Sequence, residues 1–101
     1  MYEKPVYDIL ESDIFKSWHK QITDKRTHQV IAAQIRRMAY GNLSKAKSLK
    51  NGLYEVKIDY GPGYRLYFVN RDKKIIFLLC GGDKSTQQSD ITTARKMAKE
   101  V

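Results

Sequence analysis

The segment LYEVKIDYGPGYRLYFVNRDKKIIFLLCGGDK, residues 53–84, decides the fold because it holds the only sustained strand pattern in the chain. Apolar and polar residues alternate from Tyr54 to Tyr60, and a second alternating run extends from Tyr64 to Asn70. A period of two residues is typical of a strand with one face in water. Because the Gly61–Gly63 segment breaks the chain between the runs, the sequence predicts a β-hairpin.

The apolar residues also predict the register of this hairpin. If residues 61–63 form the loop, Ile58 lies opposite Leu66 and Asp59 lies opposite Arg65. A slip of one residue would set charged side chains against apolar ones, so we expect the first register. The other face then looks too polar for a core, since it carries Glu55, Lys57, Asp59, Arg65 and Tyr67.

A third strand is expected over Ile75–Cys80, where the residues are continuously apolar. Such a run indicates a strand that is covered on both faces. The polar residues 70–73 form the turn before it. Gly81 and Gly82 are expected to end the strand and to leave Asp83 and Lys84 at the edge of the sheet.

Two helices with a tight connection are expected before the hairpin, after a short strand over Pro5–Leu10. Ser12 or Asp13 caps the first helix, Thr23–Asp24 caps the second, and Gly41 ends it. Apolar residues recur at spacings of three and four: Ile14, Phe15, Trp18 and Ile22, then Val30, Ile31, Ile35 and Met38. The helices are expected to be antiparallel.

A polar linker over residues 42–52 and a last helix over Ser85–Glu100 complete the prediction. The apolar stripe of that helix is thin, with Ile91, Ala94 and Ala98. The sequence therefore predicts one α+β domain over residues 1–101. Its element order is β-α-α-β-β-β-α, and a small antiparallel sheet packs against the N-terminal helical hairpin.

Positive charge gives the first indication of function. The chain has 19 Lys and Arg against 11 Asp and Glu, and a net charge of +8. Residues 43–101 hold twelve of the basic and six of the acidic side chains, so the excess lies mainly in the half with the hairpin. A cationic surface of this kind attracts polyanions, nucleic acid above all, although it also serves solubility.

Several classes of protein are disfavoured by composition. No apolar run is long enough to span a membrane, and the first residues lack the pattern of a secretion signal. Cys80 is the one cysteine, which argues against disulfides and favours a cytoplasmic location. His19 and His28 match no metal-ligand spacing, so neither a metal site nor a cofactor is expected.

The polar face of the hairpin is the candidate site. Lys57, Arg65 and Lys84 suit recognition of a phosphodiester, and Tyr67 either shields the sheet or stacks on a base. RNA supplies its own nucleophile, the 2′-hydroxyl, so its cleavage needs no metal if fixed cations stabilise the phosphate. The alternative is an exposed ion pair of Asp59 with Arg65 beside a solvated Lys57. In the linker, Lys45, Lys47 and Lys50 are placed to rim a groove.

The segments GLYEVKIDYGPGYRLYF and LLCGGDKSTQQSDI resemble the addiction-module killer proteins, a HigB-like branch of the RelE/ParE superfamily of bacterial toxins. The resemblance extends over essentially the whole chain. It implies an α+β toxin domain and a ribosome-dependent endoribonuclease, an mRNA interferase, of a type II toxin-antitoxin system. The implied partners are mRNA on the ribosome and a cognate antitoxin, often of the helix-turn-helix type, with operator DNA bound only through the complex.

The resemblance also assigns roles to residues. Arg65 matches the arginine that stabilises the scissile phosphate, Lys57 a basic residue proposed as base or phosphate ligand, and Lys84 a cation after the last strand. Where many relatives carry Tyr or His near the last helix, this chain has Gln87, Gln88 and Asp90, of which Asp90 is the candidate for substrate contact. Because ParE-type members act on gyrase, the alternative is a non-catalytic toxin that obstructs the ribosome or gyrase.

Overall fold

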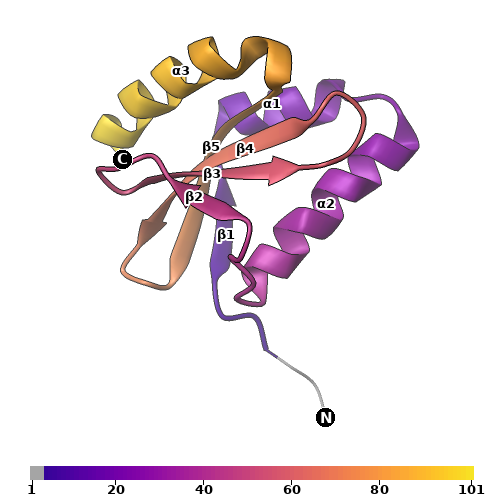
Figure 1. Cartoon of the computed structure of the whole chain (residues 1–101). Helices are drawn as coiled ribbons and strands as arrows, with labels where there is room; N and C mark the ends of the chain where they lie inside the picture. The colour runs from indigo at the N-terminus through magenta and orange to yellow at the C-terminus, as the bar shows by residue number, and fades with distance from the viewer. Residues whose placement is uncertain (1–3) are drawn as a thin grey trace.

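The computed structural model describes residues 4–101 and forms a five-stranded sheet with three α-helices (Figure 1). The elements in chain order are β1 (Asp8–Glu11), α1 (Asp13–Gln21), α2 (Lys25–Ala39), β2 (Ala46–Ser48), β3 (Leu53–Ile58), β4 (Tyr64–Arg71), β5 (Ile75–Asp83), a 3₁₀ turn (Lys84–Thr86) and α3 (Gln87–Glu100). The predicted α+β class is therefore confirmed. No helix within residues 4–101 has the length and apolarity needed to cross a membrane.

The sheet has the strand order β1-β5-β4-β3-β2. β1 runs parallel to β5, and all the other neighbours are antiparallel. The sheet is thus mixed, whereas the sequence predicted an antiparallel one. β1 also begins at Asp8, later than predicted, because the backbone N–H groups of Val6 and Tyr7 donate to the carbonyl of Ala39 at the end of α2.

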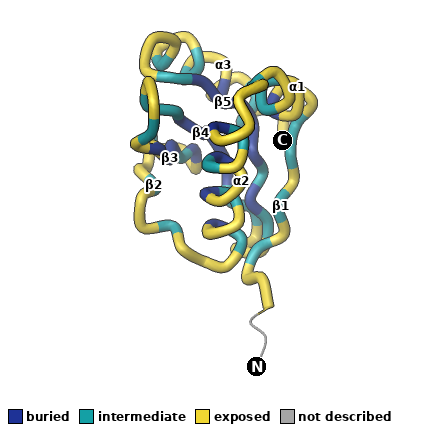
Figure 2. Tube along the Cα trace, turned by 90° about the vertical axis from the view of Figure 1, so that its right-hand side faces the viewer, coloured by how far each residue is buried: buried dark blue, intermediate teal, exposed yellow. Residues whose placement is uncertain are grey.

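The core has two parts, one on each face of the sheet. Phe15 of α1 and Ile31 and Met38 of α2 pack on one face, and all three are fully buried. α3 covers the other face through Ala94. The central strands are accordingly the most buried part of the chain, between exposed helical surfaces (Figure 2).

The predicted caps start both N-terminal helices. The Ser12 hydroxyl accepts the Phe15 N–H at 2.9 Å, and Asp24 accepts the Thr27 N–H at 2.9 Å and the Thr27 hydroxyl at 2.6 Å. These hydrogen bonds lower the pKa of Asp24. The helices diverge from their connection (Figure 1) and do not form the antiparallel pair that we expected.

Three further details of the sheet differ from the predictions. The linker contains β2, an edge strand of three residues. β5 continues through Gly81 and Gly82 to Asp83, so the glycines do not end it. In the hairpin, Val56 lies opposite Leu66 and Ile58 opposite Tyr64, a shift of two residues from the predicted register. Such a shift keeps every side chain on its predicted face.

His19 and His28 stack across the connection between α1 and α2. Their ring centres are 3.8 Å apart, and the planes differ by 10°. Burial lowers the pKa of His19, and the charge of His28 acts in the same direction, against the opposing effects of a hydrogen bond to the His28 backbone and the charge of Glu11. The two stacked rings therefore pack the connection between the helices.

This pair predicts a loss of stability in mild acid. Since the folded chain binds a proton at His19 less readily than the unfolded chain does, the free energy of unfolding is expected to fall as the pH drops below about 6.5, by at most about 1.4 kcal/mol per pH unit. Urea unfolding between about pH 7 and about pH 5 measures this. A His19→Asn variant should show a flatter dependence; equal slopes for both proteins would contradict the prediction.

Candidate functional site

An open pocket of about 310 Å³ lies at the end of the β3–β4 hairpin. It is lined by Lys57, Asp59, Tyr60, Gly61, Pro62, Gly63, Arg65 and Lys84. We call it the Arg65 pocket. The structure thus brings together the three cations that the sequence singled out: Lys57 from β3, Arg65 from β4 and Lys84 from the 3₁₀ turn after β5.

The register of the sheet places these cations. Lys57 of β3 and Arg65 of β4 lie directly opposite each other. Asp83, the last residue of β5, pairs with Tyr64, so Lys84 emerges next to the same hairpin. The Ser85 hydroxyl and N–H donate to the Asp83 carboxylate, lower its pKa and fix the start of the 3₁₀ turn. Like charges opposite each other repel, so the pocket favours an anion between them.

Arg65 is nearly buried, with only 8% of its side chain exposed. Its Nη1 donates to the Gly63 carbonyl at 3.1 Å, and its Nε lies 3.9 Å from Glu55 Oε2 without a hydrogen-bond partner in the described chain. Gln87 of α3 donates to the same carboxylate oxygen at 3.0 Å. The Gly63 carbonyl and the Glu55 carboxylate therefore hold the guanidinium in place. Its remaining N–H groups can still donate to a ligand.

Lys57 and Lys84 are far more accessible. Lys57 Nζ lies 3.4 Å from Asp59 Oδ1, and both side chains are mostly exposed. The expected alternative had paired Asp59 with Arg65, but Arg65 pairs with Glu55 instead. An exposed pair is worth little, so Asp59 can release Lys57 to a stronger anion. Lys84 is exposed and forms no ion pair with any residue from 4 to 101.

α3 partly covers the face of the β3–β4 hairpin that we expected to be too polar for a core. Glu55, Arg65 and Tyr67 are all buried there. Tyr67 is fully buried, so it shields the sheet and its ring is not accessible to a base in this structure. Burial and the nearby Glu55 charge raise the pKa of Tyr67, which keeps its hydroxyl protonated.

Tyr60 is the aromatic residue that lines the Arg65 pocket, and the sequence did not single it out. The alternation assigned it to the apolar face, and its ring does pack partly against the core. The sequence feature that could have identified Tyr60 as a pocket residue is its position next to the Gly61–Gly63 turn. A half-buried ring next to three cations suits stacking on a base.

The remaining predicted residues lie outside the Arg65 pocket. Lys45 and Lys47 are exposed at the edge strand β2, and Lys50 lines a different hollow. Asp90 accepts a hydrogen bond from the Thr86 hydroxyl at 2.6 Å and lies against Gly82. The sequence placed all four at or near the substrate, and the structure does not bring them to the pocket.

No cluster of three or more His, Cys, Asp or Glu side chains with metal-binding geometry occurs in the described part of the chain. Cys80 is buried, and burial together with the Asp90 charge raises its pKa to about 12. The thiol is therefore a poor nucleophile.

The fold matches solved toxin structures. A doubly substituted form of the Escherichia coli toxin RelE in the free state has a TM-score of 0.73 at 14% identity, over 91% of this chain and 97% of that one. A chain of the intact E. coli RelBE toxin-antitoxin complex gives a TM-score of 0.57 at 15% identity, over 76% of this chain and 95% of that one. The toxin-antitoxin complex RelBE2 of Mycobacterium tuberculosis gives 0.53 at 18%, over 79% and 99%.

Sequence comparisons show the family. An uncharacterized protein of Haemophilus influenzae is 42% identical over 87 residues, which cover 86% of this chain and 88% of that protein. The model of the family described as "Phage derived protein Gp49-like (DUF891)" matches residues 13–99. The chain therefore belongs to the phage-derived Gp49-like family, and its fold is that of the RelE toxins.

Proposed function

We propose that this protein is the toxin of a type II toxin-antitoxin system and that it cleaves mRNA at the ribosome, as an mRNA interferase of the HigB-like branch. The observation that carries the proposal is the convergence of Lys57, Arg65 and Lys84 on one open pocket. RelE-like proteins of the same fold occur in complexes with antitoxins, which supports an antitoxin partner here. The antitoxin is expected to be of the helix-turn-helix type, and operator DNA is bound only through the complex.

The proposed reaction is a transfer within the RNA. The 2′-oxygen attacks the adjacent phosphorus, and the bond from phosphorus to the 5′-oxygen of the next nucleotide breaks. The products are a 2′,3′-cyclic phosphate and a free 5′-hydroxyl. One proton leaves the 2′-hydroxyl and one reaches the 5′-oxygen, so the step needs no co-reactant.

Each cation has a role in this proposal. Arg65, held by Glu55 and Gly63, presents its free N–H groups to the phosphate oxygens, where negative charge grows in the transition state. Lys84 adds a second positive charge from the other side of the hairpin. Lys57, in an exchangeable pair with Asp59, assists proton transfer. Tyr60 stacks on a neighbouring base.

The lysines of the linker extend the proposed RNA contact. Lys45 and Lys47 are exposed along β2, next to the strand that carries Lys57. Lys50 follows in the turn before β3. Charges of this kind hold the flanking phosphates without reading sequence. Asp90, predicted as a substrate contact, accepts a hydrogen bond from Thr86 beside Gly82, outside the Arg65 pocket.

Lys84→Ala is expected to slow RNA cleavage by about 10- to 100-fold, because a charge that stabilises the transition state is lost. The free energy of unfolding should change by less than about 0.5 kcal/mol, since the side chain is exposed. Primer extension on mRNA in a purified translation system measures the cleavage. Lys96→Ala, on the exposed side of α3, is the matched control and should cleave normally. Equal rates for both variants would remove Lys84 from the mechanism.

The second candidate is a non-catalytic toxin that obstructs the ribosome or gyrase. The near burial of Arg65 in its pair with Glu55 favours it, because such an arginine has to reorient before it grips a phosphate. Primer extension on mRNA from cells that express the protein separates the two candidates. Growth arrest with new 5′ ends supports cleavage, whereas growth arrest without them supports obstruction.

A further inference from the structure

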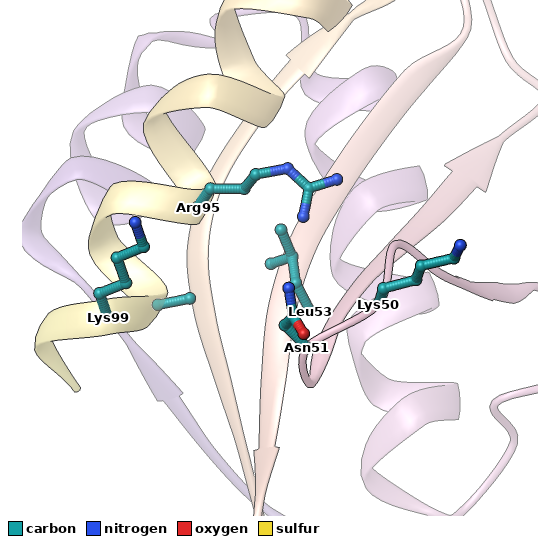
Figure 3. A pocket seen from close by; sticks show the side chains of 6 residues that line it. Lys50, Asn51, Leu53, Arg95 and Lys99 are labelled. Carbon is teal, nitrogen blue, oxygen red and sulfur yellow. The ribbon is translucent and has the colours of Figure 1, made fainter.

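A second hollow, of about 290 Å³, lies between the β2–β3 turn and the end of α3 (Figure 3). It is lined by Lys50, Asn51, Leu53, Arg95, Ala98 and Lys99. We call it the α3 hollow. It shares no residue with the Arg65 pocket, and Lys50 is the one lining residue that also belongs to the proposed RNA contact.

The floor of the α3 hollow is apolar and its walls are fixed. Leu53, only 1% exposed, belongs to the core cluster under α3. The turn beside it is closed by a hydrogen bond from the Leu49 N–H to the Leu53 carbonyl at 2.8 Å, and Arg95 donates to the Leu49 carbonyl at 3.1 Å. This contact ties α3 to the turn, so a ligand meets walls that are already in place.

The rim of the hollow is cationic. Arg95 and Lys99 lie one helical turn apart on α3 and flank Leu53 from that side, while Lys50 extends away from the turn (Figure 3). Like charges at this spacing repel each other. No carboxylate is among the residues that line the hollow. Arg95 and Lys99 form no ion pair with any described residue. The site therefore combines an apolar floor with positive charge that is not neutralised.

We propose that the α3 hollow binds an acidic peptide segment of a protein partner. An aliphatic side chain of the peptide packs on Ala98 above the buried Leu53, and a neighbouring carboxylate lies between Arg95 and Lys99. Arg binds a carboxylate through two parallel hydrogen bonds, which suits this rim. RNA fits less well, because the lining contains no aromatic ring on which a base stacks.

A titration followed by NMR tests the proposal on the full chain labelled with ¹⁵N. The probe is an acetylated peptide of alternating Glu and Leu, and the control peptide has Lys in place of Glu. The Glu peptide is expected to shift the amide signals of Asn51, Leu53 and Ala98, and the Lys peptide is not. Lys99→Gln, which keeps the Arg95 contact with Leu49, should weaken binding about threefold to tenfold. Lys96→Gln, outside the hollow, should bind as the unmodified protein does.

Three outcomes would overturn the proposal. The Glu peptide shifts no signal, or it shifts only residues of the Arg65 pocket, or a single-stranded RNA shifts Leu53 and Ala98 more strongly than the peptide does. The same RNA titration reports separately on Arg65 and Lys84. A protein that binds RNA at the Arg65 pocket but no peptide at the α3 hollow would contradict this proposal alone.

Discussion

Arg65→Ala is expected to abolish cleavage of translated mRNA, with a loss of at least about 100-fold, because the pocket loses its only group with paired donors for the phosphate oxygens. Stability is expected to fall as well, by about 1 to 3 kcal/mol, since Glu55 stays buried without its partner. Primer extension measures the first effect, and urea unfolding measures the second.

A double variant separates these two effects. Glu55→Gln combined with Arg65→Ala removes the buried negative charge and keeps an amide that can still bond to Gln87. Its free energy of unfolding should return toward that of the unmodified protein, while cleavage stays absent. Glu55→Gln alone retains Arg65 and should still cleave. Normal cleavage by the Arg65→Ala variant would show that the arginine has no part in the mechanism.

The convergence of the three cations was predictable in part from the sequence. The alternation in β3 and β4 assigns Lys57 and Arg65 to the same face. This holds for the predicted register and for any register that differs from it by two residues. Their direct opposition was not predictable, because the alternation is equally satisfied by a shift of two residues. The structure adopts the shifted register with a loop that is longer than the predicted one over residues 61–63. In this loop the Gly63 N–H donates to the Tyr60 carbonyl at 3.1 Å.

The burial of the polar face was not predictable from local pattern. Glu55 and Arg65 look like solvent-exposed strand residues, and only the arrival of α3 covers them. The contact of Glu55 with Gln87 joins residues that are 32 positions apart. Since a strand pattern reports on neighbours along the chain, it cannot show that a distant helix supplies a partner for a charged side chain.

Local sequence patterns predicted the helix caps but not the short strand β2 or the role of the two glycines in β5. The caps at Ser12 and Asp24 act within three residues, and the structure has both as predicted. β2 has three residues, too few to show an alternation, so it could not be distinguished from a linker. Gly81 and Gly82 were interpreted as the end of a strand, although the strand continues through both. The reason for these glycines lies in the side chains that pack on them.

Gly81 and Gly82 allow a helix to approach each face of β5. A Cβ at Gly81 would lie within 3 Å of the Trp18 ring of α1, and one at Gly82 would collide with Asp90 of α3. β5 therefore needs glycine at both positions because the neighbouring side chains leave no space for a Cβ atom. An unusual backbone conformation is not the reason. Because β5 leads directly to Lys84, this close packing also positions a proposed catalytic cation.

Gly81→Ala is accordingly expected to lower the free energy of unfolding by about 2 to 3 kcal/mol, near the upper end for an overpacked site. Trp18 cannot easily yield, because its ring also packs against Phe15 and Tyr64. Urea unfolding measures the loss, and cleavage should fall with it as the end of β5 shifts. Adding Trp18→Leu makes room for the new methyl group, so the double variant should be more stable than the two separate losses predict, by about 1 kcal/mol or more. Strictly additive losses would mean that Trp18 is not what requires glycine at position 81.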